Sequence, residues 1–195
     1  MSLQNFVVPG LVVAVGSAAL LLTAYNWRVQ IAALGFLYLG TFVMVSVAWP
    51  LDLAVIKLVA GWMAGAVLGL SRVGNAALPE TEQGWPTERL FRLLAAVLLV
   101  TTAVSLTPTL LNWVPEMLPV QIWGGLSLIG FGLLMLGFSG RTFQVILSLL
   151  CLLAGFEILY ATVETSTLVA GLLALVNLAI ALVGTYIMPY AEMPS

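Results

Sequence analysis

Histidine is absent from this 195-residue chain, and cysteine occurs only once, as Cys151. Without histidine, the chain lacks the side chain that most often binds metals and exchanges protons near neutral pH. One cysteine cannot form a disulfide within a chain, and the paired His and Cys spacings of zinc and haem sites are missing. We therefore expect no metal site, no cofactor and no catalytic residues.

Charge is scarce as well. Charged residues make up 7% of the chain, whereas an ordinary soluble domain is roughly a quarter charged. The six basic residues do not cluster and the net charge is -2, so nucleic acid is not an expected partner. Hydrophobic residues make up 62%, and the mean hydropathy is +1.15. A water-soluble surface cannot be built from this composition, so the expected surroundings are a lipid bilayer.

Long apolar runs fill most of the chain. A helix of about 20 apolar residues spans the hydrocarbon core of a membrane, and turn or charged residues separate seven such runs here. The predicted fold is an all-α integral membrane protein, a bundle of about seven transmembrane helices. The predicted spans are 6–24, 29–49, 51–70, 90–112, 117–138, 142–163 and 167–188.

The charges differ between the two ends of this predicted bundle. Seven crossings place the joins after the first, third and fifth helices on one side. All five arginines fall on that side, namely Arg28, Arg72, Arg89, Arg92 and Arg141. The opposite side carries Asp52, Glu116 and Glu164 and no arginine. Because positively charged loops stay in the cytoplasm, we expect the N-terminus outside and the C-terminus in the cytoplasm.

A three-helix unit is predicted on each side of the fourth helix. Each unit has an arginine in the turn after its first helix, and the third helices share Leu-Val-Ala-Gly at 58–61 and 168–171. This pattern indicates a weak internal duplication. The predicted organisation is a three-helix membrane unit at 1–72, a cytoplasmic loop at 73–89, a linking helix at 90–114 and a second three-helix unit at 115–195.

Glu157 lies well inside the sixth predicted span. An ionised group near the centre of a membrane helix costs about 2.5–3.5 kcal/mol on insertion scales, so such residues usually face a bundle interior and often serve ion pathways. We therefore predict a proton relay role for Glu157. The alternative is a protonated or paired glutamate that only fixes helix packing.

Lys57, the only lysine, is predicted to lie at nearly the same depth as Glu157. The third and sixth helices run in opposite directions, so the two side chains could form a buried pair that offsets part of both desolvation costs. In that arrangement Lys57 is a second proton relay candidate. Alternatively, the lysine could extend its ammonium group to the outer interface, near Asp52. The sequence leaves both possibilities open.

Uncharged polar residues lie deep in the last two helices. Gln144, Ser148 and Cys151 follow one another at helical spacing, and Asn177 lies near the middle of the seventh span. Such groups most often form hydrogen bonds between packed helices. A proton path through them is the less frequent alternative, in which Asn177 would be a further relay candidate.

Three glycines recur every fourth residue in the third helix, at Gly61, Gly65 and Gly69. They line one face with small residues, which lets another backbone approach closely. We predict a helix-packing surface there, with a neighbour either in this chain or in a partner.

The last three helices share an arrangement with a known family. They comprise a glycine-rich helix from Ile122, the short turn Ser139-Gly140-Arg141, a helix with a Gly155-Phe156-Glu157 core and a closing apolar helix. This resembles the three-helix K-type subunit of respiratory complex I and its C-type counterpart in Mrp antiporters. In that family, Glu157 would correspond to a membrane-embedded glutamate. A further acidic residue usually found in the third helix is replaced here by Asn177.

The resemblance implies a small, non-catalytic subunit beside larger antiporter-like membrane subunits, in a prokaryotic plasma membrane. It would support proton or cation movement, with Glu157 as one station in a chain of buried ionisable groups. A structural or assembly protein without an ion relay is the alternative, and a small free-standing transporter is another. The transporter would require broken helices and a polar pocket at the midplane. Catalysis by this chain alone is not expected, because no nucleophile and base are paired.

Overall fold

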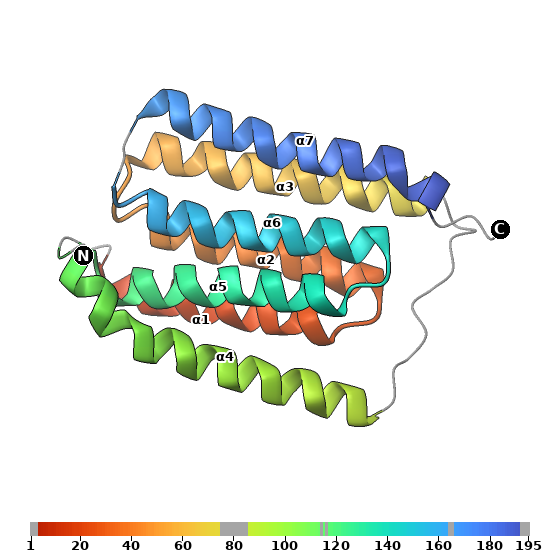
Figure 1. Ribbon diagram of the computed structural model, residues 1–195. Coiled ribbons are helices and arrows are strands. Elements are labelled where there is room, and N and C mark those ends of the chain that lie inside the picture. Colours follow the sequence, from red (N-terminus) through yellow and green to blue (C-terminus); the bar gives the residue numbers. More distant parts are fainter. Residues whose placement is uncertain (1–3, 75–85, 114, 116, 164–165, 192–195) are drawn as a thin grey trace.

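The computed structural model describes residues 4–74, 86–113, 115, 117–163 and 166–191 (Figure 1). All regular structure in these residues is helical, and successive helices run in opposite directions along one common axis. The helices are α1 (Gln4–Thr23), α2 (Trp27–Val45), α3 (Leu51–Gly74), α4 (Pro86–Trp113), α5 (Pro119–Phe138), α6 (Thr142–Tyr160) and α7 (Thr167–Ala191). Glu116, Glu164 and most of the predicted loop, 75–85, lie outside the described residues.

Six of these helices, α2 to α7, are long and apolar enough to cross a membrane, with apolar stretches of 19 to 24 residues. The apolar stretch in α1, Val7–Thr23, is shorter. The predicted all-α class is therefore confirmed, and the chain has the architecture of an integral, multi-pass membrane protein.

The helix ends differ from the predicted ends by a few residues. α2 ends at Val45 rather than 49, and α6 ends at Tyr160 rather than 163, because a turn follows each of these residues. α4 begins at Pro86, where proline is well suited to a first helical turn because that turn does not use its N–H groups. Since α3 also continues to Gly74, helices extend into both ends of the segment 73–89 that was predicted to be a loop.

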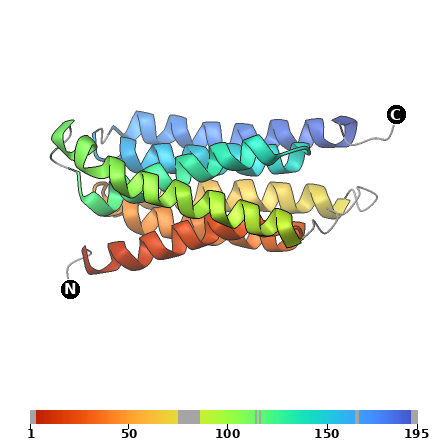
Figure 2. The same cartoon turned by 60° about the horizontal axis from the view of Figure 1, so that its bottom comes forward.

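The helices form two layers of three. α1, α2 and α3 pack side by side in one layer, and α5, α6 and α7 do so in the other. Each helix also contacts its counterpart across the layers, α1 with α5, α2 with α6 and α3 with α7. Figure 2 shows the two layers, with α4 crossing in front of both. α4 lies at the edge of the bundle formed by α5 and α1 and packs against these two helices (Figure 1). The centre of the molecule is therefore a contact between two three-helix layers.

The first two helices of each layer have matching bounds, offset by 115 residues in the sequence. Adding 115 to the first and last residues of α1 and α2 gives the bounds of α5 and α6, and α7 begins 116 residues after α3. The helix ends agree as well: Ser46 N–H donates to Phe42 O after α2, and Ala161 N–H donates to Glu157 O after α6. The backbone of the second unit thus repeats that of the first in these two helices.

Equivalent glycines also mark the helix crossings within each layer. A Cβ added at Gly40 would lie 2.8 Å from the carbonyl oxygen of Gly10, where α2 crosses α1. A Cβ added at Gly155 would lie 2.7 Å from the carbonyl oxygen of Gly125, where α6 crosses α5. Because these distances are too short for a side-chain carbon, both crossings depend on glycine for close backbone approach.

The second layer is stacked on the first in the same orientation, so the two layers meet through faces that are not equivalent. Phe36 and Leu39 of α2 are exposed, whereas Cys151 and Ala154, 115 residues later in α6, are fully buried. The second layer therefore buries a face whose counterpart in the first layer points outward.

The arginines gather at one end of the bundle. The α1–α2 and α5–α6 turns, the end of α3 and the start of α4 all lie at that end (Figure 1). Arg92 of α4 donates to the carbonyl oxygen of Leu22 at 3.1 Å and lies over the ring of Phe138, so it connects α4 to both layers. Arg72 lies over the ring of Phe143, 5.2 Å from the ring centroid.

Candidate functional site

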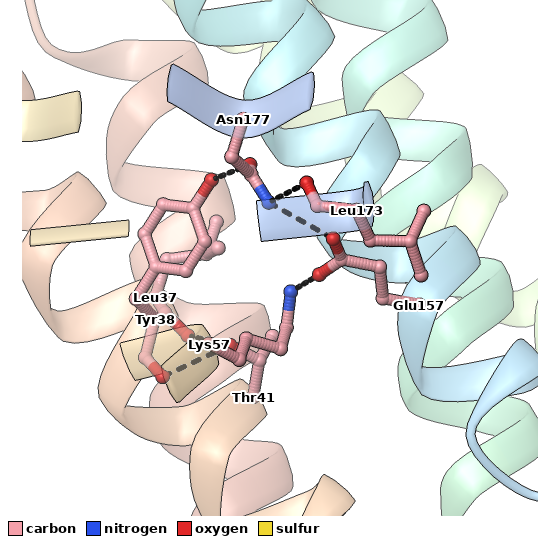
Figure 3. A network of polar contacts seen from close by, with 7 residues as sticks. All are labelled: Leu37, Tyr38, Thr41, Lys57, Glu157, Leu173 and Asn177. Carbon is pink, nitrogen blue, oxygen red and sulfur yellow. Dashed lines mark hydrogen bonds and ion pairs between the residues drawn. The ribbon is translucent and has the colours of Figure 1, made fainter. Parts of the chain in front are cut away.

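Four polar side chains meet between the two layers, one from each of α2, α3, α6 and α7. They are Tyr38, Lys57, Glu157 and Asn177, and we call them the polar cluster (Figure 3). Their exposed fractions are 0%, 4%, 2% and 0%. All four are therefore shielded from the surroundings of the bundle.

Lys57 and Glu157 form an ion pair through Nζ and Oε2. Of the two arrangements that the sequence left open, the structure shows the pair and not an ammonium group extended toward Asp52. α3 packs on α7 and α2, and α6 packs on the same two helices, so Lys57 of α3 and Glu157 of α6 can reach one another across the layer contact. Each buried charge costs several kcal/mol of desolvation, which the partner charge offsets in part.

Asn177 connects Glu157 to Tyr38. Its Nδ2 donates to Glu157 Oε1 at 2.9 Å and to the backbone oxygen of Leu173 at 3.2 Å. Its Oδ1 accepts a hydrogen bond from the Tyr38 hydroxyl at 2.6 Å. The structure thus brings together Glu157, Lys57 and Asn177, the three residues that the sequence nominated as relay candidates.

Tyr38 is the member of the cluster that the sequence analysis missed. Its ring packs on Gly61, and Lys57 Nζ lies 5.3 Å from the ring centroid, within the range of a cation–π contact. The sequence did contain a signal for Tyr38. Tyrosines of membrane helices are enriched at the membrane interfaces, whereas Tyr38 lies near the middle of α2. A tyrosine at mid-span needs a polar partner for its hydroxyl group.

The packing surface predicted at Gly61, Gly65 and Gly69 faces α2 of the same chain, but side chains contact it, not a backbone. The Tyr38 ring fills the space in front of Gly61. A Cβ at Gly69 would meet Ile31 at 3.3 Å, and one at Gly65 would meet only Leu34, at 3.8 Å. The expectation of close backbone approach along this face is therefore wrong.

Two further polar residues of α6, Ser148 and Cys151, contact backbone carbonyl groups. Ser148 Oγ donates to Gln144 O at 2.6 Å. Cys151 Sγ lies 3.5 Å from Leu128 O on α5. Both hydrogen bonds stabilise helices or helix packing and do not extend the polar cluster.

Metal ligands are not gathered anywhere in the described ranges: no three His, Cys, Asp or Glu side chains are placed to hold an ion together. The chemistry available in the cluster is therefore that of one carboxyl, one amine, one carboxamide and one phenol. Of these, the carboxyl and amine can exchange a proton directly, because they are in contact.

Comparison of the chain with family models, with curated proteins and with solved structures found no match.

Proposed function

We propose that this chain is a small membrane subunit of a larger ion-translocating assembly, and that Glu157 serves there as a buried protonation site. The observation that carries the proposal is the Lys57–Glu157 ion pair, enclosed between the two layers. Ionisable groups inside a membrane are expensive, and they commonly mark ion or proton pathways. The likeness of the last three helices to K-type and C-type subunits is consistent with this role.

The pair can lose and regain its charge separation by an internal proton transfer, while its net charge stays zero. Transfer of a proton from Lys57 Nζ to Glu157 Oε2 converts two opposite charges into two neutral groups, and the reverse transfer restores them. In a low-dielectric interior, the balance between these forms responds strongly to nearby charges and to hydration. A charge that moves in an adjacent subunit would thus shift the protonation of this pair.

Partner subunits are part of the proposal because one enclosed cluster does not form a path across a membrane. The mid-span surface of α4 supports a helix–helix contact with such a partner. Thr101, Thr102 and Ser105 are exposed there, and their hydroxyl groups bind carbonyl oxygens of α4 itself. Hydroxyl-bearing residues on a membrane helix surface favour association with another helix.

A structural or assembly role is the second candidate. It is favoured by the same cluster, since Tyr38, Asn177 and the ion pair connect four helices across both layers. A free-standing transporter has less support, because α1 to α7 are each continuous over the described residues and none is broken at mid-span.

The proposed orientation places the arginine-rich end in the cytoplasm, with seven crossings and the N-terminus outside. Single cysteines introduced at Asn26, in the α1–α2 turn, and at Ser166, before α7, test this in a Cys151→Ser background. An impermeant thiol reagent added to sealed cells should label position 166 and not position 26. The opposite labelling pattern would reverse the orientation.

The function is tested by purification in mild detergent, identification of the co-purifying chains and ion-transport assays of the reconstituted assembly. Glu157→Gln keeps the shape of the side chain but removes its titration, so the complex should assemble and lose most ion-coupled activity. Asp52→Asn is the matched control, because it neutralises an exposed acid at the start of α3. Transport at the wild-type rate by a fully assembled Glu157→Gln complex would leave the structural role as the better explanation.

A further inference from the structure

The two oxygens of Glu157 have different surroundings. Oε1 accepts a hydrogen bond from Asn177 Nδ2, whereas Oε2 faces Lys57 Nζ. Apart from the ion pair, Oε2 and Nζ have no hydrogen-bond partner among the described residues. One carboxylate oxygen is thus held by a neutral amide, and the other is in contact with a group that can give or take a proton.

The orientation of the Asn177 amide follows from its neighbours. The backbone oxygen of Leu173 can only accept a hydrogen bond, so the amide atom beside it must be the nitrogen. The amide oxygen then faces Tyr38, and the Tyr38 hydroxyl must be the donor in that contact. The phenol is therefore protonated in this arrangement, and its single proton is used to hold the amide.

Other titratable side chains near Glu157 are few in the described part of these helices. Lys57 faces it from α3 and α7 contributes the neutral Asn177, whereas Tyr38 of α2 contacts Lys57 and Asn177 rather than Glu157 itself. On α6 itself, Cys151 points to Leu128 O of α5. The local charge balance therefore depends mainly on Glu157, Lys57 and the hydrogen bonds made to them.

We propose that Asn177, oriented by Tyr38, is a positioning residue that occupies Oε1 and so makes Oε2 the oxygen through which Glu157 exchanges its proton. In the exchange, the N–H bond of the Lys57 ammonium breaks and an O–H bond forms at Oε2, which leaves a neutral amine and a neutral carboxylic acid. Asn177 carries no proton in this step. Its N–H group stabilises the ionised carboxylate more than the neutral acid, because hydrogen bonds to charged groups are the stronger ones.

The use of this exchange in transport rests on the proposed function, but its chemistry can be measured in the chain alone. The probe is the infrared carbonyl band of Glu157 in the full chain, carrying ¹³C-labelled glutamate, in lipid nanodiscs. Glu157→Gln identifies the band by its loss. The ratio of protonated to ionised Glu157 is then compared between variants at one fixed pH.

In Asn177→Leu, this ratio should rise about tenfold, which corresponds to the loss of one hydrogen bond to a charged group, about 1.4 kcal/mol. Tyr38→Phe should raise it in the same direction by about threefold, because Leu173 O still holds the amide. Tyr38→Phe also retains the aromatic ring, so it decides the matter if Asn177→Leu does not fold. Thr41→Val is the matched control: it removes another buried hydroxyl of α2, which binds only Leu37 O and Tyr38 O.

An unchanged ratio in Tyr38→Phe would overturn the proposal, and so would an equal rise in Thr41→Val. Either result would mean that the hydrogen bonds serve packing alone. This outcome is separate from the test of function. If the Glu157→Gln assembly transports at the wild-type rate, the proposed function is wrong, even when the infrared ratio changes as expected. If transport is lost in Glu157→Gln but the infrared ratio does not change in Tyr38→Phe, only the positioning role is wrong.

Discussion

The α1–α2–α3 layer and the α5–α6–α7 layer have the same helix lengths in their first two helices and the same glycine crossings, but their equivalent positions differ in polarity. At the 115-residue separation, Glu157 corresponds to Phe42, and Tyr38 corresponds to Leu153. Each layer thus contributes polar residues where the other has apolar ones. The comparison shows that the backbone plan is repeated and the polar chemistry is not.

The third helices differ in the same way, and the Leu-Val-Ala-Gly runs at 58–61 and 168–171, which are 110 residues apart, do not occupy equivalent positions in them. At their separation of 116 residues, Lys57 corresponds to Leu173, and Asn177 corresponds to Gly61. Both counterparts also belong to the surroundings of the cluster, since Leu173 O binds Asn177 and Gly61 makes room for the Tyr38 ring. The polar cluster therefore exists only where the two layers meet, and neither layer could form it alone.

The largest effect is expected from the replacement of Lys57 by an apolar residue. Lys57→Met should lower the free energy of unfolding by about 3–5 kcal/mol, because it leaves the Glu157 carboxyl buried without its partner. Reversible unfolding in mixed micelles measures this value. Leu58→Met, at the partly buried neighbouring position, serves as the control and should change stability by less than about 1.5 kcal/mol.

Combining Lys57→Met with Glu157→Leu makes both positions apolar, as their counterparts are in the other layer. Such a replacement of a buried ion pair is often neutral or stabilising. The double variant should therefore recover most of the stability lost in the single variant. If the double variant is as unstable as Lys57→Met, apolar residues cannot replace the pair, and the ion pair itself contributes net stability to the fold.

A smaller effect is expected at the glycine that accommodates Tyr38. Gly61→Ala should lower the free energy of unfolding by about 2–4 kcal/mol, since the new methyl group overlaps the ring and displaces the hydroxyl from Asn177. Gly65→Ala, one turn later, should be nearly neutral, because its Cβ would meet only Leu34 at an ordinary 3.8 Å. Equal losses at the two positions in the same unfolding assay would contradict this account.

The sequence predicted the helices well because apolar runs of this length leave the backbone few alternatives in a membrane. It also predicted the depth of Lys57 and Glu157, since residue counts along two antiparallel helices are enough for that. Tyr38 could not be placed in the cluster by counting, because its contacts depend on which helices become neighbours across the layers. The glycine spacing in α3 was misleading for the same reason, since the close backbone contacts lie instead where α1 crosses α2 and α5 crosses α6, at Gly40, Gly132 and Gly155.

The last prediction tests whether the two layers share their packing as closely as their backbones indicate. Gly40→Ala and Gly155→Ala should each lower the free energy of unfolding by about 1–3 kcal/mol, because each new Cβ would lie within 3 Å of the carbonyl oxygen of the crossing helix. The two losses should agree to within about 0.5 kcal/mol, and they should add in the double variant because the sites lie in different helix pairs.

Gly16→Ala is the control, since nothing lies within 4 Å of its Cβ position, and in open space alanine favours a helix by up to about 1 kcal/mol. A large loss at Gly155 with none at Gly40 would mean that only the second layer depends on close helix contact, so that the shared helix bounds do not reflect shared packing.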